Sequence, residues 1–270
     1  MILDLRKGFG KFEDYELFKF PDNSIKFIDK NVNTPYSQIR TTVRSVEDIW
    51  TLGLIKDVLE REGKHLPPLR IDYLFTQQDD RIFNEKESFG LKITLGFLNS
   101  LGFPEIEIFH PHNADPVEMG LNNCVVIPND LFIRWSVGGI GTEPNTPIWV
   151  IPDAGAFKTQ FKQIQKWNYP KFITCMKSRA HTGEIETVVN TEDLKGQDCF
   201  LIDDISLGAR THINIAKELK LKNCGKLYLI VSHGVFNYGI DHILEHFETI
   251  YTTDSICTIP ESDRLKIFKL

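Results

Sequence analysis

Short apolar segments alternate with helix-like segments along this chain, and this alternation limits the possible folds more than any other feature. In the second half, "PIWVIP", "DCFLI" and "KLYLIVS" have the length and apolar character of buried strands. Helix-like stretches follow them, namely "GAFKTQFKQIQKW", "INIAKELKLKNCG" and "GIDHILEHF". Strands that alternate with helices predict an α/β fold in which a mostly parallel sheet is flanked by helices.

The first half shows a similar order of elements. The segments "YELFKF" and "SIKFID" surround a Pro-Asp-Asn turn at residues 21–23 and predict a hairpin. A helix is predicted over residues 45–63, followed by the strand "LRIDYLF", a helix that closes near Gly102, and the strand "EIEIFH". Because the halves are similar and "GGIGTEPNTP" lies between them, we expect two tandem domains, residues 1–144 and 145–270.

The composition is that of a globular protein without a membrane segment. The 270 residues are 41% hydrophobic and 25% charged, and the net charge of −6 argues against nucleic acid or an anionic membrane as a partner. No apolar run approaches the roughly 18–20 residues that a membrane helix needs, and the start lacks a signal peptide, so we expect a cytoplasmic protein. The five cysteines include no CxxC pair, which disfavours a zinc site.

Polar residues that suit nucleotide and phosphate chemistry recur directly after the predicted strands. They are Gln78, Asp79, His110, His112, Asp153, Lys177, Arg179, Asp203, Asp204 and His233. In a parallel sheet the carboxyl ends of the strands lie at one edge, where such folds bind ligands. Carboxylates there can hold Mg²⁺, and cations can neutralise a transferring phosphoryl group. Each residue alone also suits a helix cap, a loop or the surface, but their shared placement favours a site.

The stretch "FLIDDISLGARTH", residues 200–212, resembles the ribose-phosphate loop of the type I phosphoribosyltransferase fold. In that loop, apolar residues lead to two acids and then to a short glycine-containing turn that ends in threonine. Six further segments narrow the resemblance to the ribose-phosphate diphosphokinase (phosphoribosyl diphosphate synthetase) family. They are "TQQDDR", "FHPHNADP", "IPDAGA", "MKSRAHTG", "SHGVFNYG" and "TDSICTIPESD". The fifth is similar to a family segment Thr-His-Gly-(apolar)-Phe-Ser-Gly, and the order of all seven holds from about residue 16 onward.

The resemblance implies two phosphoribosyltransferase-type domains that assemble as a homodimer or homohexamer. It implies transfer of the β,γ-diphosphoryl group of Mg-ATP to the 1-hydroxyl of ribose 5-phosphate, with Lys177 and Arg179 as catalytic residues on a mobile flap. The implied ATP-binding residues are Phe20, Asp22, Gln77, Gln78, Asp79 and His112, the first two acting on a neighbouring subunit's adenine. The implied ribose-phosphate ligands are Asp203, Asp204, Gly208, Ala209, Arg210 and Thr211. The implied metal ligands are His112, Asp153, Asp203 and Asp204.

The loop departs from the family pattern where the 5-phosphate would bind. The family has an acid at the position of Leu207, and small residues where this chain has Gly208, Ala209 and Arg210. Arginine adds bulk and a bidentate phosphate donor. A ligand whose 5-phosphate continues into a second phosphate and a nucleoside would suit an open, arginine-lined loop of this kind. We therefore favour ADP-ribose slightly over ribose 5-phosphate as the acceptor, with a role in NAD salvage like that of phage-encoded relatives; a drifted loop that binds ribose 5-phosphate is the alternative.

Two other classes of function stay open. A phosphoribosyltransferase would share the two acids but have a single domain, and the "MKSRAHTG" and "FHPHNADP" segments disfavour it. A catalytically silent partner that regulates an active subunit would have no chemical need for the retained lysine, arginine, histidine and aspartates. An unrelated doubly wound nucleotide binder lacks support, because the chain has neither GxGxxG after a strand nor GxxxxGK[ST].

Overall fold

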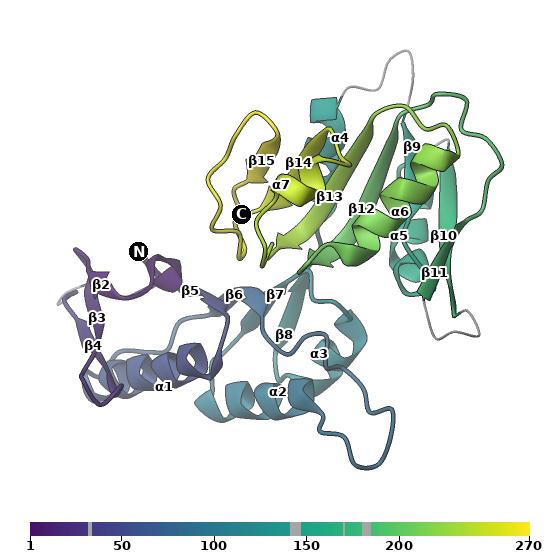
Figure 1. The fold of residues 1–270 in the computed structure, drawn as a ribbon. Coiled ribbons are helices and arrows are strands. Elements are labelled where there is room, and N and C mark those ends of the chain that lie inside the picture. Colours follow the sequence, from purple (N-terminus) through teal and green to yellow (C-terminus); the bar gives the residue numbers. More distant parts are fainter. Residues whose placement is uncertain (32–33, 141–146, 170, 180–184) are drawn as a thin grey trace. The chain divides into compact units, whose positions relative to one another are not determined.

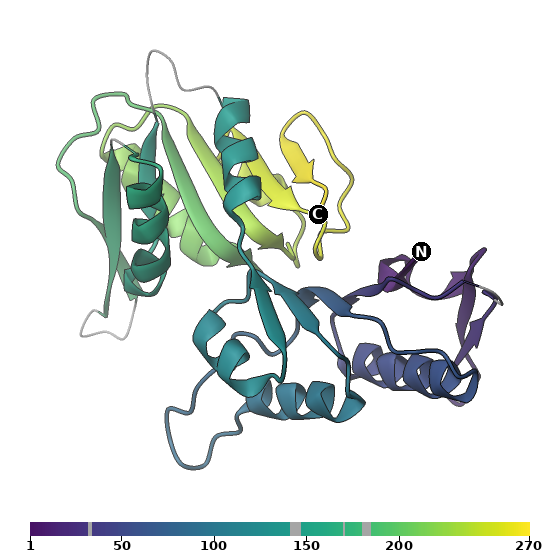
Figure 2. The same cartoon turned by 180° about the vertical axis from the view of Figure 1, so that it is seen from behind.

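The chain has the predicted α/β fold, seen in two views in Figures 1 and 2. The structure is a computed structural model that describes residues 1–270 apart from residues 32–33, 141–146, 170 and 180–184. Contacts divide the chain into two compact units, Met1–Pro128 and Asn129–Leu270. The predicted domain boundary between residues 144 and 145 lies outside the described residues, so that boundary stays a prediction.

The first unit is built on a parallel sheet with the strand order β1-β5-β6-β7-β8. Its strands are β1 (Ile2–Asp4), β5 (Gln38–Val43), β6 (Leu69–Leu74), β7 (Ile106–Phe109) and β8 (Cys124–Ile127). Its helices are η1 (Leu5–Lys7), α1 (Val46–Arg61), α2 (Gly90–Leu101) and α3 (Ala114–Gly120). The predicted hairpin is confirmed, because β3 (Tyr15–Lys19) pairs antiparallel with β4 (Ile25–Asp29), and β2 (Gly10–Lys11) extends this small sheet.

Helices α1 and α2 form where apolar residues recur at helical spacing. In α1, Leu52, Ile55 and Leu59 are buried along one face, and the Asp48 carboxylate accepts the backbone N–H of Ser45 at 2.9 Å at the start of the helix. Helix α2 ends at Gly102, whose φ of 72° lies in the left-handed region that glycine adopts without strain. Both predicted helices are confirmed, and their buried faces pack in one apolar core with the sheet.

The second unit is a sheet with the order β11-β10-β9-β12-β13-β14-β15, parallel except for the β10–β11 pair. Its strands are β9 (Ile148–Ile151), β10 (Phe172–Arg179), β11 (Ile185–Val189), β12 (Cys199–Ser206), β13 (Leu227–Gly234), β14 (Thr249–Thr253) and β15 (Leu265–Phe268). Its helices are α4 (Asp130–Ile140), α5 (Ala154–Lys166), α6 (Arg210–Leu221) and α7 (Asp241–Leu244). Helices α6 and α7 cover one face of the sheet, and α4 and α5 cover the other (Figures 1 and 2).

Strand β12 lies in the middle of this sheet and is buried on both faces. Cys199 and Leu201 join the apolar core on the side of α6, whereas Phe200 and Ile202 join the core on the side of α4 and α5. Side chains alternate between the faces of a strand, so a strand between two helix layers must be apolar at successive positions. This explains the unbroken apolar run before Asp203 and fixes where its carboxylate emerges.

Candidate functional site

The two acids of the predicted ribose-phosphate loop lie within β12 and not after it. The strand continues past Asp203 and Asp204 to Ser206, which pairs with Gly234 of β13. Residues 207–209 then lead into α6, whose cap residue Ala209 has a φ of 57° and makes no side-chain capping hydrogen bond. The first turn of α6 therefore presents backbone N–H groups that no cap side chain satisfies, which favours an anion at this end of the helix.

Asp203 is held from inside by a histidine of the following helix. Its Oδ2 lies 2.8 Å from Nε2 of His212, and its Oδ1 accepts the backbone N–H of Asp204 at 3.0 Å. Because a carboxylate can only accept, Nε2 donates to it, and Nδ1 of the same ring lies 3.2 Å from the Ser206 hydroxyl. Burial raises the pKa of Asp203 to about 6; the His212 hydrogen bond opposes this shift, and the adjacent Asp204 adds to it.

This Asp203–His212–Ser206 chain orients a carboxylate and does not activate a nucleophile. Ser206 is fully buried, so its hydroxyl cannot reach a substrate, whereas the Asp203 side chain is 20% exposed. The interpretation from sequence did not include His212 in the site. A signal was present, because positions 212, 215, 216 and 219 form the buried face of α6, and a histidine on such a face needs a buried partner.

The turn that follows β13 lies against the loop at residues 207–209. The backbone N–H of Val235 donates to Ser206 O at 3.0 Å, and that of Asn237 donates to Leu207 O at 3.0 Å. The ring of Tyr238 lies so close to Gly208 that a Cβ there would be 3.1 Å from its Cε2. Tyr238 itself is 80% exposed. Arg210 is exposed and Thr211 half-buried at the start of α6, so the predicted phosphate ligands are gathered at one rim.

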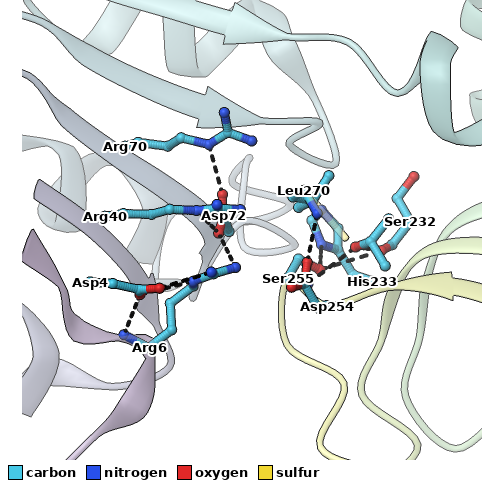
Figure 3. A network of polar contacts seen from close by, with 11 residues as sticks. Asp4, Arg6, Arg40, Arg70, Asp72, Ser232, His233, Asp254, Ser255 and Leu270 are labelled. Atoms are coloured by element: carbon cyan, nitrogen blue, oxygen red, sulfur yellow. Dashed lines mark hydrogen bonds and ion pairs between the residues drawn. The ribbon is translucent and has the colours of Figure 1, made fainter. Parts of the chain in front are cut away.

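His233, at the end of β13, is a buried structural residue. Its Nδ1 lies 2.8 Å from the Ser255 hydroxyl, and neither residue is exposed. The Thr253 hydroxyl donates to Ser232 O at 2.6 Å, and the backbone N–H of Leu270 donates to Asp254 at 2.9 Å. Figure 3 shows how this network joins the ends of β13 and β14. It fixes the strand from which the turn carrying Tyr238 departs.

Two further predicted ligands of the second unit lie at other strands. Asp153 precedes α5 and its Oδ1 accepts the Ala156 N–H at 3.0 Å, so this acid caps the helix. Lys177 and Arg179 lie in the last part of β10, where they pair with Thr187 and Ile185 of β11. The side chains of this pair lie outside the described residues, as does the segment 180–184 that follows, so the flap stays a prediction.

In the first unit, two predicted nucleotide ligands are hydrogen-bonded to each other. The Gln77 side chain is buried, and its Oε1 accepts the backbone N–H of His112 at 2.9 Å. The side-chain nitrogen of Gln77 has no hydrogen-bond partner among the described residues. Gln78 and His112 are exposed. The hydrogen bond between Gln77 and His112 thus joins the loops after β6 and β7. The side-chain nitrogen of Gln77 is left as a buried donor at this place.

Two aspartates of the first unit, Asp79 and Asp80, accept hydrogen bonds that hold its loops in place. Asp79 accepts the backbone N–H of Gly90 at 2.6 Å at the start of α2, where any side chain would clash with that carboxylate. Asp80, which the sequence interpretation left out of the site, accepts from the Asn113 amide at 2.9 Å. Burial alone would raise the pKa of Asp80, but hydrogen bonds from Arg81 and Asn113 hold it below its usual range.

Phe20 and Asp22 lie at the exposed tip of the β3–β4 hairpin. Asp22 accepts both the backbone N–H of Ser24 at 3.0 Å and its hydroxyl at 2.7 Å, and these bonds lower the Asp22 pKa. Phe20 is 45% exposed, with its ring edge-on to Phe18. The turn is therefore rigid although its side chains face solvent.

A buried charge cluster occupies the polar face of the first unit's sheet. Asp72 of β6 has no exposed surface, and Arg40 and Arg70 donate to its two carboxylate oxygens at 2.7 and 2.9 Å. Arg6 reaches the same carboxylate at 3.2 Å and also binds Asp4. Figure 3 shows the three arginines converging on Asp72. Their charge exceeds that of the two aspartates, so this cluster is not a cation site.

The described part of the chain contains no group of three or more His, Cys, Asp or Glu side chains arranged to hold a metal ion. Of the predicted metal ligands, only Asp203 and Asp204 are neighbours within one unit. None of the helices in the described ranges is long and apolar enough to cross a membrane.

Comparison with known proteins identifies relatives along nearly the whole chain. No family model matches it. It is 23% identical to a ribose-phosphate pyrophosphokinase of Thermococcus kodakarensis over 261 residues, 94% of this chain and 90% of that protein. It is 22% identical to the Pyrococcus furiosus protein of the same name over 248 residues, 90% of this chain and 86% of that protein.

The fold has a solved counterpart as well. The crystal structure of phosphoribosylpyrophosphate synthetase from Mycobacterium smegmatis superposes with a TM-score of 0.80 at 14% identity, over 94% of this chain and 85% of that one. The sequence relatives and this shared fold agree with each other and with the seven segments quoted above. The chain is thus similar in sequence to ribose-phosphate pyrophosphokinases along most of its length, and it shares the fold of a phosphoribosylpyrophosphate synthetase.

Proposed function

We propose that this chain is an ATP-dependent diphosphokinase that transfers the β,γ-diphosphoryl group of ATP to the 1-hydroxyl of a ribose-phosphate moiety and releases AMP. The names of its relatives support the reaction class. The observation that carries the proposal is the geometry at the end of β12. Two adjacent carboxylates, Asp203 and Asp204, are followed six residues later by Arg210, the first residue of a helix without a side-chain cap.

The chemistry follows from that geometry. Asp203 and Asp204 accept hydrogen bonds from the 2- and 3-hydroxyls of the ribose, and the backbone of residues 208–211 holds its 5-phosphate at the start of α6. His212 keeps the Asp203 carboxylate in one orientation, so the sugar binds without reordering it. A ribose fixed at both ends presents its 1-hydroxyl in one position, which in-line displacement at the β-phosphorus requires.

The donors at the end of β12 also fit the predicted Mg²⁺. Magnesium binds through one or two carboxylates together with substrate phosphates and keeps several waters, so it needs no preformed protein cage. Asp203 and Asp204 have this donor chemistry, and a bound cation would favour the ionised form of Asp203, whose pKa burial raises. Bound there, Mg²⁺ would neutralise charge on the phosphates. Asp153 and His112 remain predicted ligands of Mg-ATP.

ATP would bind through Gln77, Gln78, Asp79 and His112. The buried, unpartnered amide nitrogen of Gln77 supports this placement, because a buried donor is costly unless a ligand or water satisfies it. Lys177 and Arg179 would stabilise the charge that develops on the transferred group. We infer a homodimer or homohexamer in which Phe20 and Asp22 contact a neighbouring subunit's adenine; their exposure on a rigid turn supports this.

We favour ADP-ribose as the acceptor, and NAD salvage as the context, over ribose 5-phosphate. Leu207 is 38% exposed and carries no charge at a position where the family pattern has an acid. Arg210 is exposed at the first position of α6, where it can follow a phosphate chain outward. A 5-phosphate that bears a second phosphate keeps its anomeric hydroxyl free for the reaction.

The test is release of AMP from Mg-ATP with ribose 5-phosphate and ADP-ribose supplied separately, and product masses measured. We expect a diphosphorylated product from at least one acceptor, and a higher kcat/KM for ADP-ribose. A product from ribose 5-phosphate alone would overturn the acceptor assignment. No AMP from either would overturn the diphosphokinase and favour a silent partner. Lys177→Ala, with fold and assembly checked, separates catalysis by this chain from that of a contaminant.

A further inference from the structure

The turn after β13 places an exposed aromatic ring at the rim of the acceptor loop. Tyr238 is 80% exposed, although large aromatic side chains usually bury most of their surface. One part of the ring lies against Gly208, where an added Cβ would be 3.1 Å from Cε2 and 3.4 Å from Cδ2. Glycine at 208 thus leaves room for the ring, and the rest of the ring surface is open to a ligand.

The backbone holds this ring at a defined place. The N–H groups of Val235 and Phe236 both donate to Ser206 O, at 3.0 and 3.1 Å, and the N–H of Asn237 donates to Leu207 O at 3.0 Å. The turn closes when the Gly239 N–H donates to Phe236 O at 2.9 Å. Tyr238 is therefore fixed to the acceptor loop by main-chain bonds, and its exposure does not come from a loose segment.

An aromatic face beside a phosphate-binding loop suits one class of ligand. Planar bases stack on exposed tyrosine rings, and such stacking tolerates any base because every base has a π-face. The exposed Arg210, two residues after Gly208, supplies a donor for phosphate between the ribose and the base. A bare 5-phosphate would end at the loop and leave the ring unused.

We propose that Tyr238 is a specificity-determining residue that stacks on the base of an acceptor whose ribose 5-phosphate continues through a second phosphate to a nucleoside. This rests on the function proposed above and specifies how its acceptor is chosen. The segment "SHGVFNYG" agrees with it, because this chain has two residues, Asn237 and Tyr238, where the similar family segment has a single serine. The ring thus lies in the part of the segment that is one residue longer.

The test compares two acceptors in three variants. They distinguish the aromatic ring of Tyr238 from the bulk of its side chain and from an exposed aromatic residue elsewhere. The quantity measured is the ratio of kcat/KM for ADP-ribose to kcat/KM for ribose 5-phosphate. We expect Tyr238→Leu, which keeps bulk but loses the π-face, to lower this ratio roughly tenfold or more through the ADP-ribose KM. Tyr238→Phe should keep the ratio, and so should Phe97→Ala, which removes an exposed aromatic residue from α2.

The outcomes separate this inference from the proposed function. An unchanged ratio in Tyr238→Leu, or an equal loss with both acceptors, would overturn the stacking role. So would a change of oligomeric state by light scattering that accounts for the lost turnover, since Tyr238 would then be a subunit contact. If the wild type released no AMP with either acceptor, the diphosphokinase would be wrong. Titration calorimetry without ATP would still test the stacking role, because it measures the Kd of each acceptor directly. Tyr238→Leu should weaken ADP-ribose binding roughly tenfold relative to ribose 5-phosphate.

Discussion

Asp72 of the first unit and Asp203 of the second are both strand aspartates with little exposed surface, and they differ in the charged groups around them. Asp72 in β6 has no exposed surface and receives Arg6, Arg40 and Arg70. Asp203 in β12 receives one histidine, lies beside a second acid, and has a pKa raised to about 6. The first carboxylate is compensated by three arginines and joins β5, β6 and η1. The second has no arginine among its hydrogen-bond partners, which agrees with the ligand-binding role proposed for it.

Removing the compensated acid should have the largest effect on stability. Asp72→Asn leaves three arginines crowded at a buried site without their counter-charge, and breaking such a cluster costs about 3–5 kcal/mol. Urea unfolding would measure the loss. The control is Asp57→Asn, which removes an exposed pair with Arg61 and should leave the unfolding midpoint unchanged. A loss below about 1 kcal/mol in Asp72→Asn would mean that the cluster is not structural.

Removing Asp203 should instead lower turnover strongly. In Asp203→Asn the ribose loses its fixed carboxylate, and misplacement of a reacting group costs roughly a hundredfold in rate. The folded state should survive, because the variant removes a largely buried charge that only the His212 hydrogen bond and the Asp204 N–H stabilise among the described residues. AMP release and urea unfolding, measured on the same preparation, make the comparison. Turnover kept while stability collapses would reverse the roles assigned to the two aspartates.

Replacing His212, which positions the same carboxylate, should have a smaller effect than replacing Asp203. His212→Leu removes the donor to Asp203, and we expect the acceptor KM to rise roughly tenfold, the worth of one hydrogen bond to a charged group, with less change in the ATP KM. His212→Gln can place an amide N–H near the position of Nε2 and should restore most of the loss. A uniform fall in kcat in both variants would point to damage to the fold and not to lost positioning of Asp203.

The smallest effect is the pH dependence of stability in metal-free protein. The pKa of Asp203 is raised to about 6 in the folded chain, so between the ordinary carboxyl range and pH 6 the folded state binds the extra proton. The wild type should therefore gain stability relative to Asp203→Asn as pH falls from 7 to 4, by about 1 kcal/mol, because the Asp203 side chain is 20% exposed and solvent weakens the effect. Denaturant unfolding across this range checks the sign. A difference that shrinks toward low pH would mean that Asp203 is stabilised as an anion.

The same contrast explains what could be predicted from the sequence. The apolar part of β12 was predictable because burial on both faces produces an unbroken apolar run before the acids, although the strand itself continues to Ser206. Strand β5 was missed, because its sequence "QIRTTV" alternates with arginine and threonine, and the polar face becomes buried only through contacts to Asp72. Those contacts join residues 6, 40, 70 and 72, so no local pattern reveals them.

Helix α4 was missed for a different reason. Its sequence "DLFIRWSVGGI" ends in two glycines that lie in the stretch interpreted as a connection between domains. Glycine is a weak helix former, and tertiary contacts decide such cases. Here Phe132 and Ile133 are buried in the core behind the second sheet.

The main-chain bonds between residues 206–207 and 235–237 also bear on how such enzymes diversify. They attach the turn that carries Tyr238 to the acceptor loop while leaving the carboxylates in a different strand. If Tyr238 has the role proposed for it, a change in the length of that turn would alter which acceptor binds without touching the residues proposed to carry out the transfer. Acceptor choice and reaction chemistry would then be separable, and we expect that grafting this turn onto a relative would move its acceptor preference.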